Sequence, residues 1–286
     1  MAGYGTAASR PADNGHAPPR HGSDPERQSL LGKPHSSPGG PGVANIRKTL
    51  NAHVSRSWAD LVLLFCYVIT GLLDSASTQV WGAFVSMQTG NTVYVALGLA
   101  SIIYPPINPR LYRSGVSLLA FCVGSFLFAR FHRRFSPSRR WVLCASFAAQ
   151  SLLTVAAALV VALNRPPAGD DDVSWTVLAP LALVAFQSCG QAVTSRALRY
   201  NALSSVVLTS IYCDLFSDQD LFRRDNVDRN RRAAAPLMLL MGAVLGGIFA
   251  HAPVGIQGAL WTAAALKLSM AVIWFFWPAE PEEDQE

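Results

Sequence analysis

The chain has 286 residues, of which 51% are hydrophobic and only 14% are charged. A soluble domain carries about 25% charged residues, so much of the usual solvating surface is missing. The polar residues gather in 1–57 and 278–286, which leaves an apolar stretch between them. This excludes a nucleic-acid-binding domain, a disordered chain and a secreted disulfide scaffold. The formal net charge of +5 lies mostly in short loops, as in multi-pass membrane proteins.

The N-terminal stretch is expected to be a disordered cytoplasmic tail, spanning residues 1–57. Its first 45 residues hold seven prolines among Gly, Ser and charged residues, a composition that buries too little apolar area to offset the entropy of ordering. No apolar run follows within the first 30 residues, so we expect no signal peptide there. Residues 278–286 form a short acidic C-terminal tail.

Eight apolar segments recur between residues 58 and 277. A helix needs about 20 residues to cross the hydrocarbon core of a bilayer. Six segments are read as transmembrane helices, the last but one being short: 58–79, 111–131, 141–163, 174–197, 235–251 and 255–277. Segments 82–104 and 203–217 are predicted to be broken or re-entrant elements. The fold class is therefore an all-α integral membrane protein of about six transmembrane helices.

The arginine-rich loops support this count. Residues 130–140 and 218–232 each contain five arginines, whereas 164–175 contains three aspartates and one arginine. Positively charged loops face the cytoplasm, so six crossings place both termini on the cytoplasmic side. If all eight segments crossed the membrane, the start of the chain and the basic loop 130–140 would lie on opposite sides. Arg110 and Arg113 are the exception to this rule, because six crossings place them on the outer side. We expect the protein in the plasma membrane or an internal membrane.

An internal repeat of two halves, roughly 58–163 and 174–277, is predicted from the order of these segments. A shift of 120 residues places Thr89 and Gly90 on Thr209 and Ser210, although identity is low. Three crossings per half give the halves opposite orientations. Inverted repeats with interrupted segments at matching positions are typical of secondary transporters, and they indicate where the binding site lies.

A polar stripe marks the first transmembrane segment. Gly71, Asp74 and Thr78 share one helical face, and Gln187, Gln191 and Thr194 form a matching stripe in the second half. A carboxylate at the depth of Asp74 must face protein or water, be paired, or be protonated. Two interpretations stay open: Asp74 is a functional site residue, or it is a buried carboxyl that fixes helix packing.

The tetrapeptide Thr89-Gly90-Asn91-Thr92 lies in an apolar setting. Glycine permits unwinding, while Thr and Asn side chains can satisfy backbone groups that a helix break sets free. The sequence therefore indicates a break that could coordinate a solute or an ion. The alternative is an ordinary turn between two helices.

These motifs also carry a family resemblance. Gly71-x-x-Asp74, Phe84 and Gln88-Thr89-Gly90-Asn91-Thr92 resemble the YoaK-like family of uncharacterised multi-pass membrane proteins. The Gln187–Gln191 region and Val207-Leu208-Thr209-Ser210 resemble its second-half pattern, in which a Thr-Gly pair is more usual. The resemblance covers roughly 58–277; the tail resembles the low-complexity extensions of fungal members. It implies a membrane protein and no particular substrate.

Two further charges lie in apolar segments. Lys267 is near the middle of 255–277, and a carboxylate partner, Asp74 or Asp214, would stabilise its ammonium group. The alternative is a lysine whose head reaches the interface. Asp214 lies beside Asp218 and Asp220, which suggests a solvated acidic cluster.

Other features indicate packing alone. Gly242-x-x-x-Gly246-Gly247 permits close helix contact, and the five dispersed cysteines are read as small packing residues. The six histidines are assigned to the tail or loops. We find no catalytic or nucleotide motif, so we expect no enzyme, no cofactor, no metal and no nucleic-acid partner; the expected partners are the lipid bilayer and a small solute.

Three functions remain open. The leading hypothesis is a secondary transporter or permease, in which a carboxylate serves as a proton or cation site. The second is a non-transporting membrane scaffold, and the third is an intramembrane lipid-modifying enzyme. The candidate substrate- or ion-binding residues are Asp74, Thr78, Thr89, Gly90, Asn91, Thr92, Gln187, Gln191, Thr209 and Lys267.

Overall fold

The computed structural model describes residues 41–55, 58–164, 173–200 and 205–280. The tail predicted to be disordered, 1–57, and the acidic C-terminal tail fall largely outside these ranges. In the described part of the N-terminal tail, Pro41–Asn51 form helix α1. Its C-terminal turn lies against the start of the helix Arg140–Leu163, where Arg140 Nη1 donates to the Thr49 carbonyl oxygen at 2.9 Å.

Six of the described helices are long and apolar enough to cross a membrane: α2 (Ala59–Trp81), α4 (Arg110–Phe135), α5 (Arg140–Leu163), α6 (Trp175–Ala197), α8 (Val227–His251) and α9 (Gly255–Phe276). Helices α3 (Gln88–Ala100) and α7 (Thr209–Phe216) have 13 and 8 residues, too few to span at about 1.5 Å per residue. The described residues contain isolated β-bridges but no strand. The predicted all-α multi-pass fold is confirmed.

The break in segment 82–104 lies earlier than predicted. Helix α2 ends at Trp81, and Gly82 takes a left-handed conformation (φ 70°) while its N–H bonds to the Thr78 carbonyl. Glycine adopts positive φ at little steric cost, which explains why the helix stops there. Residues 83–87 are non-helical, and α3 starts at Gln88, so Thr89–Thr92 form the first turn of a helix and not the break itself.

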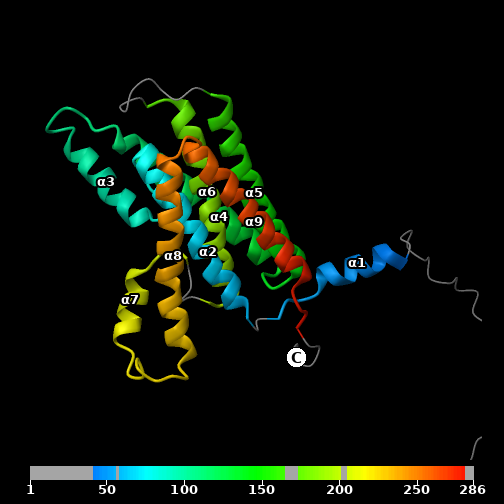
Figure 1. Cartoon of the computed structure of the whole chain (residues 1–286). Coiled ribbons are helices and arrows are strands. Elements are labelled where there is room, and N and C mark those ends of the chain that lie inside the picture. The colour runs from blue at the N-terminus through cyan, green and yellow to red at the C-terminus, as the bar shows by residue number, and fades with distance from the viewer. Residues whose placement is uncertain (1–40, 56–57, 165–172, 201–204, 281–286) are drawn as a thin grey trace, which may run out of the picture. The chain divides into compact units, whose positions relative to one another are not determined.

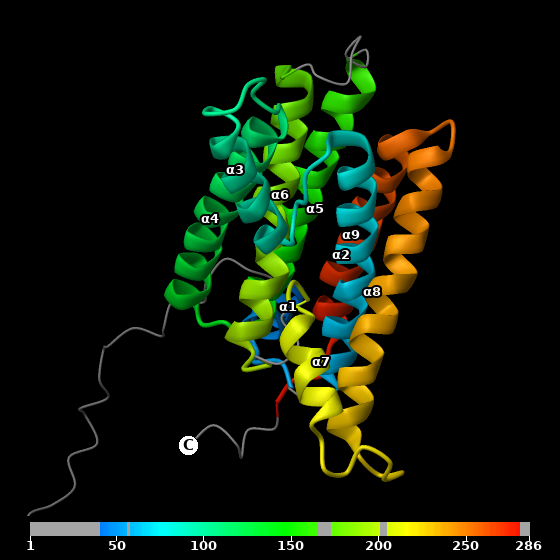
Figure 2. The ribbon, with the colours of Figure 1, turned by 90° about the vertical axis from the view of Figure 1, so that its left-hand side faces the viewer.

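The long helices pack in matching pairs. Helix α2 lies along α8, α4 along α6 and α5 along α9, while α3 packs on α4 and α7 on α8 (Figures 1 and 2). Exchanging α2–α5 for α6–α9 turns each of these pairs into another pair of the same set. Figure 2 shows α3 and α7 towards opposite ends of the bundle.

Glycines set the closest helix contacts. A Cβ on Gly242 of α8 would overlap the Val68 carbonyl of α2, and one on Gly124 of α4 would overlap the Phe186 carbonyl of α6. Gly246 meets the Leu72 carbonyl in the same way. Small residues let helix backbones approach in a membrane, where lipid tails supply no hydrophobic driving force. The packing role predicted for the Gly242–Gly247 motif agrees with these contacts.

The described residues form three buried apolar clusters, and two of them lie at opposite ends of helices α2, α5, α6 and α9. The Trp81 cluster includes Leu72, Ala76, Trp81, Ala157, Leu181, Ala185, Leu260 and Ala263. The Trp274 cluster includes Val62, Cys66, Leu143, Phe147, Leu198, Met270 and Trp274. Along α5, α6 and α9, polar residues lie between the two clusters: Gln150 on α5, Gln191 on α6 and Lys267 on α9.

Substituting Gly242 with valine is expected to destabilise the fold. The added side chain must displace the α2 backbone at Val68, and overpacking of this kind costs about 1–3 kcal/mol or more. Gly247→Ala is the matched control, because a Cβ there meets only Ser75 Oγ at 3.7 Å. Thermal unfolding of the two purified variants in detergent measures the difference. Equal melting temperatures would contradict this account of the contact.

Candidate functional site

The non-helical segment between α2 and α3 is held by side chains of four helices. Asp74 Oδ1 accepts hydrogen bonds from the backbone N–H groups of Val85 and Ser86, each at 2.8 Å. The Val85 carbonyl accepts from Ser188 Oγ of α6 at 2.7 Å. Irregular backbone at membrane depth is stable only when protein groups satisfy it, and these bonds meet that requirement.

Asn91 completes the support of the break. Its Oδ1 accepts from the Phe84 N–H at 3.0 Å, and its Nδ2 donates to the Phe84 carbonyl at 2.7 Å. The same Nδ2 lies 2.8 Å from Gln88 Oε1 and 3.1 Å from Ser117 Oγ of α4. Asn91 is fully buried, so its amide acts on the chain itself in this conformation.

The other members of the tetrapeptide lie around this amide. Gly90 packs against the Phe84 ring, which leaves no room for a side chain. Thr89 and Thr92 are exposed on the first turn of α3, and Thr92 Oγ1 donates to the Gln88 carbonyl at 2.9 Å.

A cavity of about 390 Å³ adjoins the break. Its wall includes Asp74, Thr78, Phe84, Met87 and Arg110. Asp74 is 3% exposed, and among the described residues neither its Oδ2 nor the Thr78 Oγ1 has a hydrogen-bond partner. Arg110 lies at the start of α4 with its guanidinium 4.9 Å from the centre of the Tyr94 ring. The structure thus brings Asp74 and Thr78 together beside a cavity, as the shared helical face predicts.

A second polar group, the central polar layer, consists of Thr70, Gln150, Gln191 and Lys267. Lys267 Nζ donates to Gln150 Oε1 at 2.8 Å and to Gln191 Oε1 at 2.9 Å. Gln191 Nε2 in turn donates to Thr70 Oγ1 at 2.7 Å. Lys267 and Gln150 are 0% exposed. The layer joins four helices and lies between the Trp81 cluster and the Trp274 cluster.

The carboxylate partner predicted for Lys267 is wrong in the described part of the chain. Neither Asp74 nor Asp214 pairs with it: Asp74 Oδ1 is engaged by the break, and Asp214 is exposed at the end of α7. Two glutamine oxygens take the place of a carboxylate because α5 and α6 bring them to the depth of Lys267. The alternative of a lysine reaching the interface is excluded by its complete burial.

The remaining candidates are dispersed. Gln187 is 0% exposed one turn before Gln191, and neither its amide oxygen nor its amide nitrogen has a partner among the described residues. Thr209 is exposed at the start of α7, away from both polar groups.

Several site residues escaped the sequence analysis. Gln150 and Thr70 are single polar residues within apolar segments. Their position well inside a predicted transmembrane helix is the signal that could have identified them. His132 was assigned to a loop, which is wrong: α4 continues to Phe135, and His132 is buried 3.3 Å from Ser146 Oγ.

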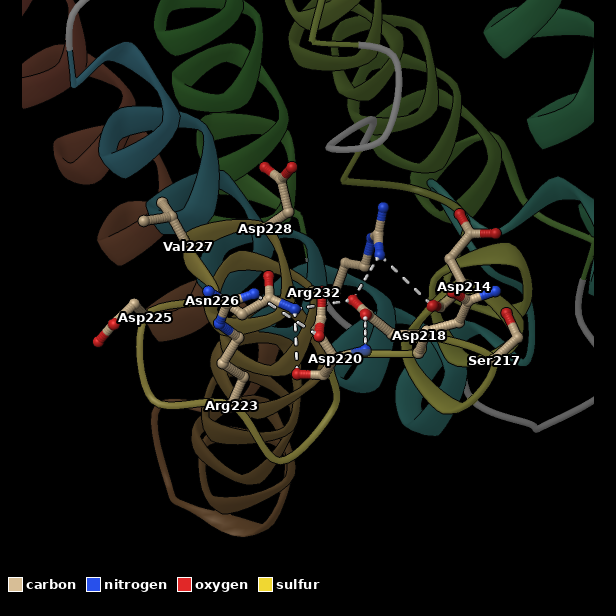
Figure 3. A pocket seen from close by; sticks show the side chains of 11 residues that line it. Asp214, Ser217, Asp218, Asp220, Arg223, Asp225, Asn226, Val227, Asp228 and Arg232 are labelled. Carbon is tan, nitrogen blue, oxygen red and sulfur yellow. Dashed lines mark hydrogen bonds and ion pairs between the residues drawn. The ribbon is translucent and has the colours of Figure 1, made fainter.

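A surface pocket of about 710 Å³ lies where α7 turns into α8 (Figure 3). Asp218 is its organiser: it accepts from the Asp220 N–H at 2.9 Å, from Asn226 Nδ2 at 3.1 Å and from Arg232 Nη1 at 3.1 Å. These bonds hold the pKa of Asp218 below its ordinary value. No group of three or more His, Cys, Asp or Glu in the described ranges is arranged to hold a metal ion. The acidic residues of this turn are thus neutralised in part by arginine.

Comparison with known proteins gives one family. The model for a protein family of unknown function, DUF1275, matches residues 62–273, which include all six long helices in whole or in large part. No curated protein and no solved structure matches the chain.

Replacing Asp74 with leucine is expected to destabilise the protein, because the buried N–H groups of Val85 and Ser86 lose their acceptor. Each unsatisfied donor costs about 1–3 kcal/mol. Asp74→Asn is the matched control, since its side-chain oxygen can accept the same bonds. Melting temperatures of the purified variants decide between them, and a leucine variant as stable as the parent would contradict the anchoring role.

Proposed function

The chain belongs to the DUF1275 family, which is also the YoaK-like family that its motifs resemble, and we propose that it is a secondary transporter or permease for a small solute. The observation that carries this proposal is the central polar layer. Lys267 is fully buried, and among the described residues its ammonium group bonds only neutral side chains, which is costly for a merely structural core. Ionisable residues buried within membrane-spanning helices commonly mark substrate or ion pathways, and transport sites lie near the membrane midplane.

The pairing of the helices supports the inverted repeat. Under the exchange of α2–α5 for α6–α9, Gly124 on the Phe186 carbonyl corresponds to Gly242 on the Val68 carbonyl. Lys267 and Gln150 then face each other from equivalent helices, α9 and α5. In transporters with this symmetry, the solute site lies where the two halves meet. The central polar layer occupies that place in this chain.

Asp74 is the proposed proton site. Its carboxylate holds the break through two N–H bonds, and protonation would remove the negative charge that strengthens them. Binding of a proton would thereby loosen the segment beside the cavity that Asp74 and Thr78 adjoin. In this proposal Thr89–Thr92 position the break, Gln187, Gln191 and Lys267 form the central site, and Thr209 starts the equivalent short helix of the second half.

One observation favours the scaffold alternative. The bonds of Asp74 and Asn91 to the break are those expected of residues that only hold helices together. The lipid-modifying enzyme remains the third hypothesis, with Asp74 as its acid or base. Solute flux separates the transporter from both alternatives, whereas product formation from lipid identifies the enzyme.

We propose that both termini face the cytoplasm, on the evidence of the arginine-rich loops. In a cysteine-free background, Phe135→Cys and Val227→Cys should resist a membrane-impermeant thiol reagent applied to intact cells. Asp170→Cys should react with it. Labelling of position 135 or 227 from outside would overturn the six-crossing orientation.

Asp74→Asn is expected to leave folding and insertion intact and to abolish proton-coupled uptake, because it keeps the hydrogen-bond acceptor and removes the titrating group. Asp74→Glu should retain part of the activity. The measurement is solute uptake into reconstituted vesicles with and without a proton gradient, at matched protein abundance and across pH. The candidate solutes come from comparing metabolites of cells with and without the protein.

The control for that experiment is Val93→Ala, which alters an exposed residue of α3 outside the candidate site and should transport normally. Full pH-dependent uptake by Asp74→Asn would end the proton-coupling proposal. Failure of Asp74→Asn to accumulate in the membrane would favour the scaffold.

A further inference from the structure

The ammonium group of Lys267 has no counter-anion within the part of the chain that the structure describes. Of its three N–H donors, two reach Gln150 Oε1 and Gln191 Oε1, and no third acceptor lies within hydrogen-bond distance among the described residues. None of the ion pairs in the described ranges involves Lys267. Amide oxygens supply dipoles but no negative charge, so the desolvation of a buried ammonium is compensated only in part.

Gln187 provides an independent sign of a missing ligand. Its side chain is fully buried, yet both of its amide atoms lack partners in the described part of the chain. Buried amides are almost always hydrogen-bonded, and an exception calls for a ligand or a water molecule. Gln187 lies one turn before Gln191 on the same face of α6, a spacing that places the two Cβ atoms about 6 Å apart.

From these two observations we infer that the central polar layer binds a small monovalent anion, an inorganic ion or a short carboxylate, between Lys267 Nζ and the amide of Gln187. The anion neutralises the lysine and accepts from the amide nitrogen. The role of the anion as the transported solute rests on the proposed function. Binding itself is inferred from the incompletely bonded Lys267 ammonium and the unpartnered Gln187 amide.

A cavity adjoins one of the two clusters that close the site. A cavity of about 530 Å³ lies directly over the Trp81 cluster and shares Trp81, Val177 and Ile256 with it. Separation of that cluster would connect the cavity to the central polar layer. The conformation described is therefore closed on both sides of the site, since the Trp274 cluster fills the other end.

The test measures binding by the purified full chain in lipid nanodiscs. Chloride, bromide, nitrate, formate and acetate are titrated as sodium salts against gluconate at constant ionic strength. A ligand that binds only the folded state raises the melting temperature in a saturable manner. We expect a saturable rise in melting temperature for at least one of these anions. Comparing the inorganic ions with the carboxylates then shows which class of anion the site binds. Lys267→Met should weaken the apparent affinity about tenfold or more.

Two further variants keep the result decisive. Gln187→Glu supplies a built-in carboxylate, so it should abolish the dependence on added anion while Lys267 remains, even where Lys267→Met fails to fold. Lys48→Met in α1 removes a lysine outside the site and should bind as the parent does. The inference is overturned if no small anion stabilises the parent more than gluconate, or if Gln187→Glu responds as the parent does.

Flux separates this result from the proposed function. Saturable binding in nanodiscs without uptake of the same anion into vesicles would leave the site in place and overturn the transporter. Uptake of another solute, unaffected by anion replacement and by Gln187→Glu, would support the transporter and overturn the anion site.

Discussion

Every polar group of the backbone at membrane depth must be satisfied inside the protein, and this constraint organises the rest of the structure. Helices satisfy it by themselves, but the segment between α2 and α3 does not. There Asp74, Asn91, Ser117 and Ser188 supply the bonds that a helix would have made internally. Since these side chains come from α2, α3, α4 and α6, the interrupted segment fastens those four helices together.

The same constraint explains why the conspicuous polar residues separate into two groups. Asp74 and Asn91 act on the backbone of the break, and their oxygen or nitrogen atoms are engaged at short distances. Thr70, Gln150, Gln191 and Lys267 act chiefly on one another, although Gln191 Nε2 also donates to Ser205 Oγ at 3.2 Å, in the non-helical segment before α7. The first group stabilises the non-helical segment between α2 and α3. In the second group, the Lys267 ammonium bonds two glutamine side chains and no backbone group among the described residues, so its charge has no comparable structural task.

The long and short helices were predictable from the sequence because the composition and the length of an apolar segment determine whether it can span a membrane. The arginine loops and the shortness of 203–217 gave the six long helices and the two short ones, as the structure has them. Within the site, the shared face of Asp74 and Thr78 was predictable from helical periodicity. The partners of Lys267 were not, because they depend on which helices meet at one depth, and a search restricted to carboxylates overlooks glutamine. The break was misplaced by a few residues because Gly82, rather than Gly90, has the positive φ.

The glycine contacts hold particular pairs of helices in close backbone contact. Gly242 and Gly246 lock α8 onto α2, and Gly124 locks α4 onto α6, through backbone contacts that leave no room for sliding side chains. Each locked pair contributes one residue to the central polar layer: α2 contributes Thr70 and α6 contributes Gln191. Helix α5 packs on α6, α9 packs on α2 and α8, and these two helices contribute the other two residues. A change that admits a ligand would therefore move the pairs as units and exchange the bonds between Thr70, Gln191 and Lys267, while the glycine contacts persist. The glycine contacts thus keep each helix pair intact, whereas the side-chain hydrogen bonds of the central polar layer are the contacts between helices that can be exchanged for bonds to a ligand.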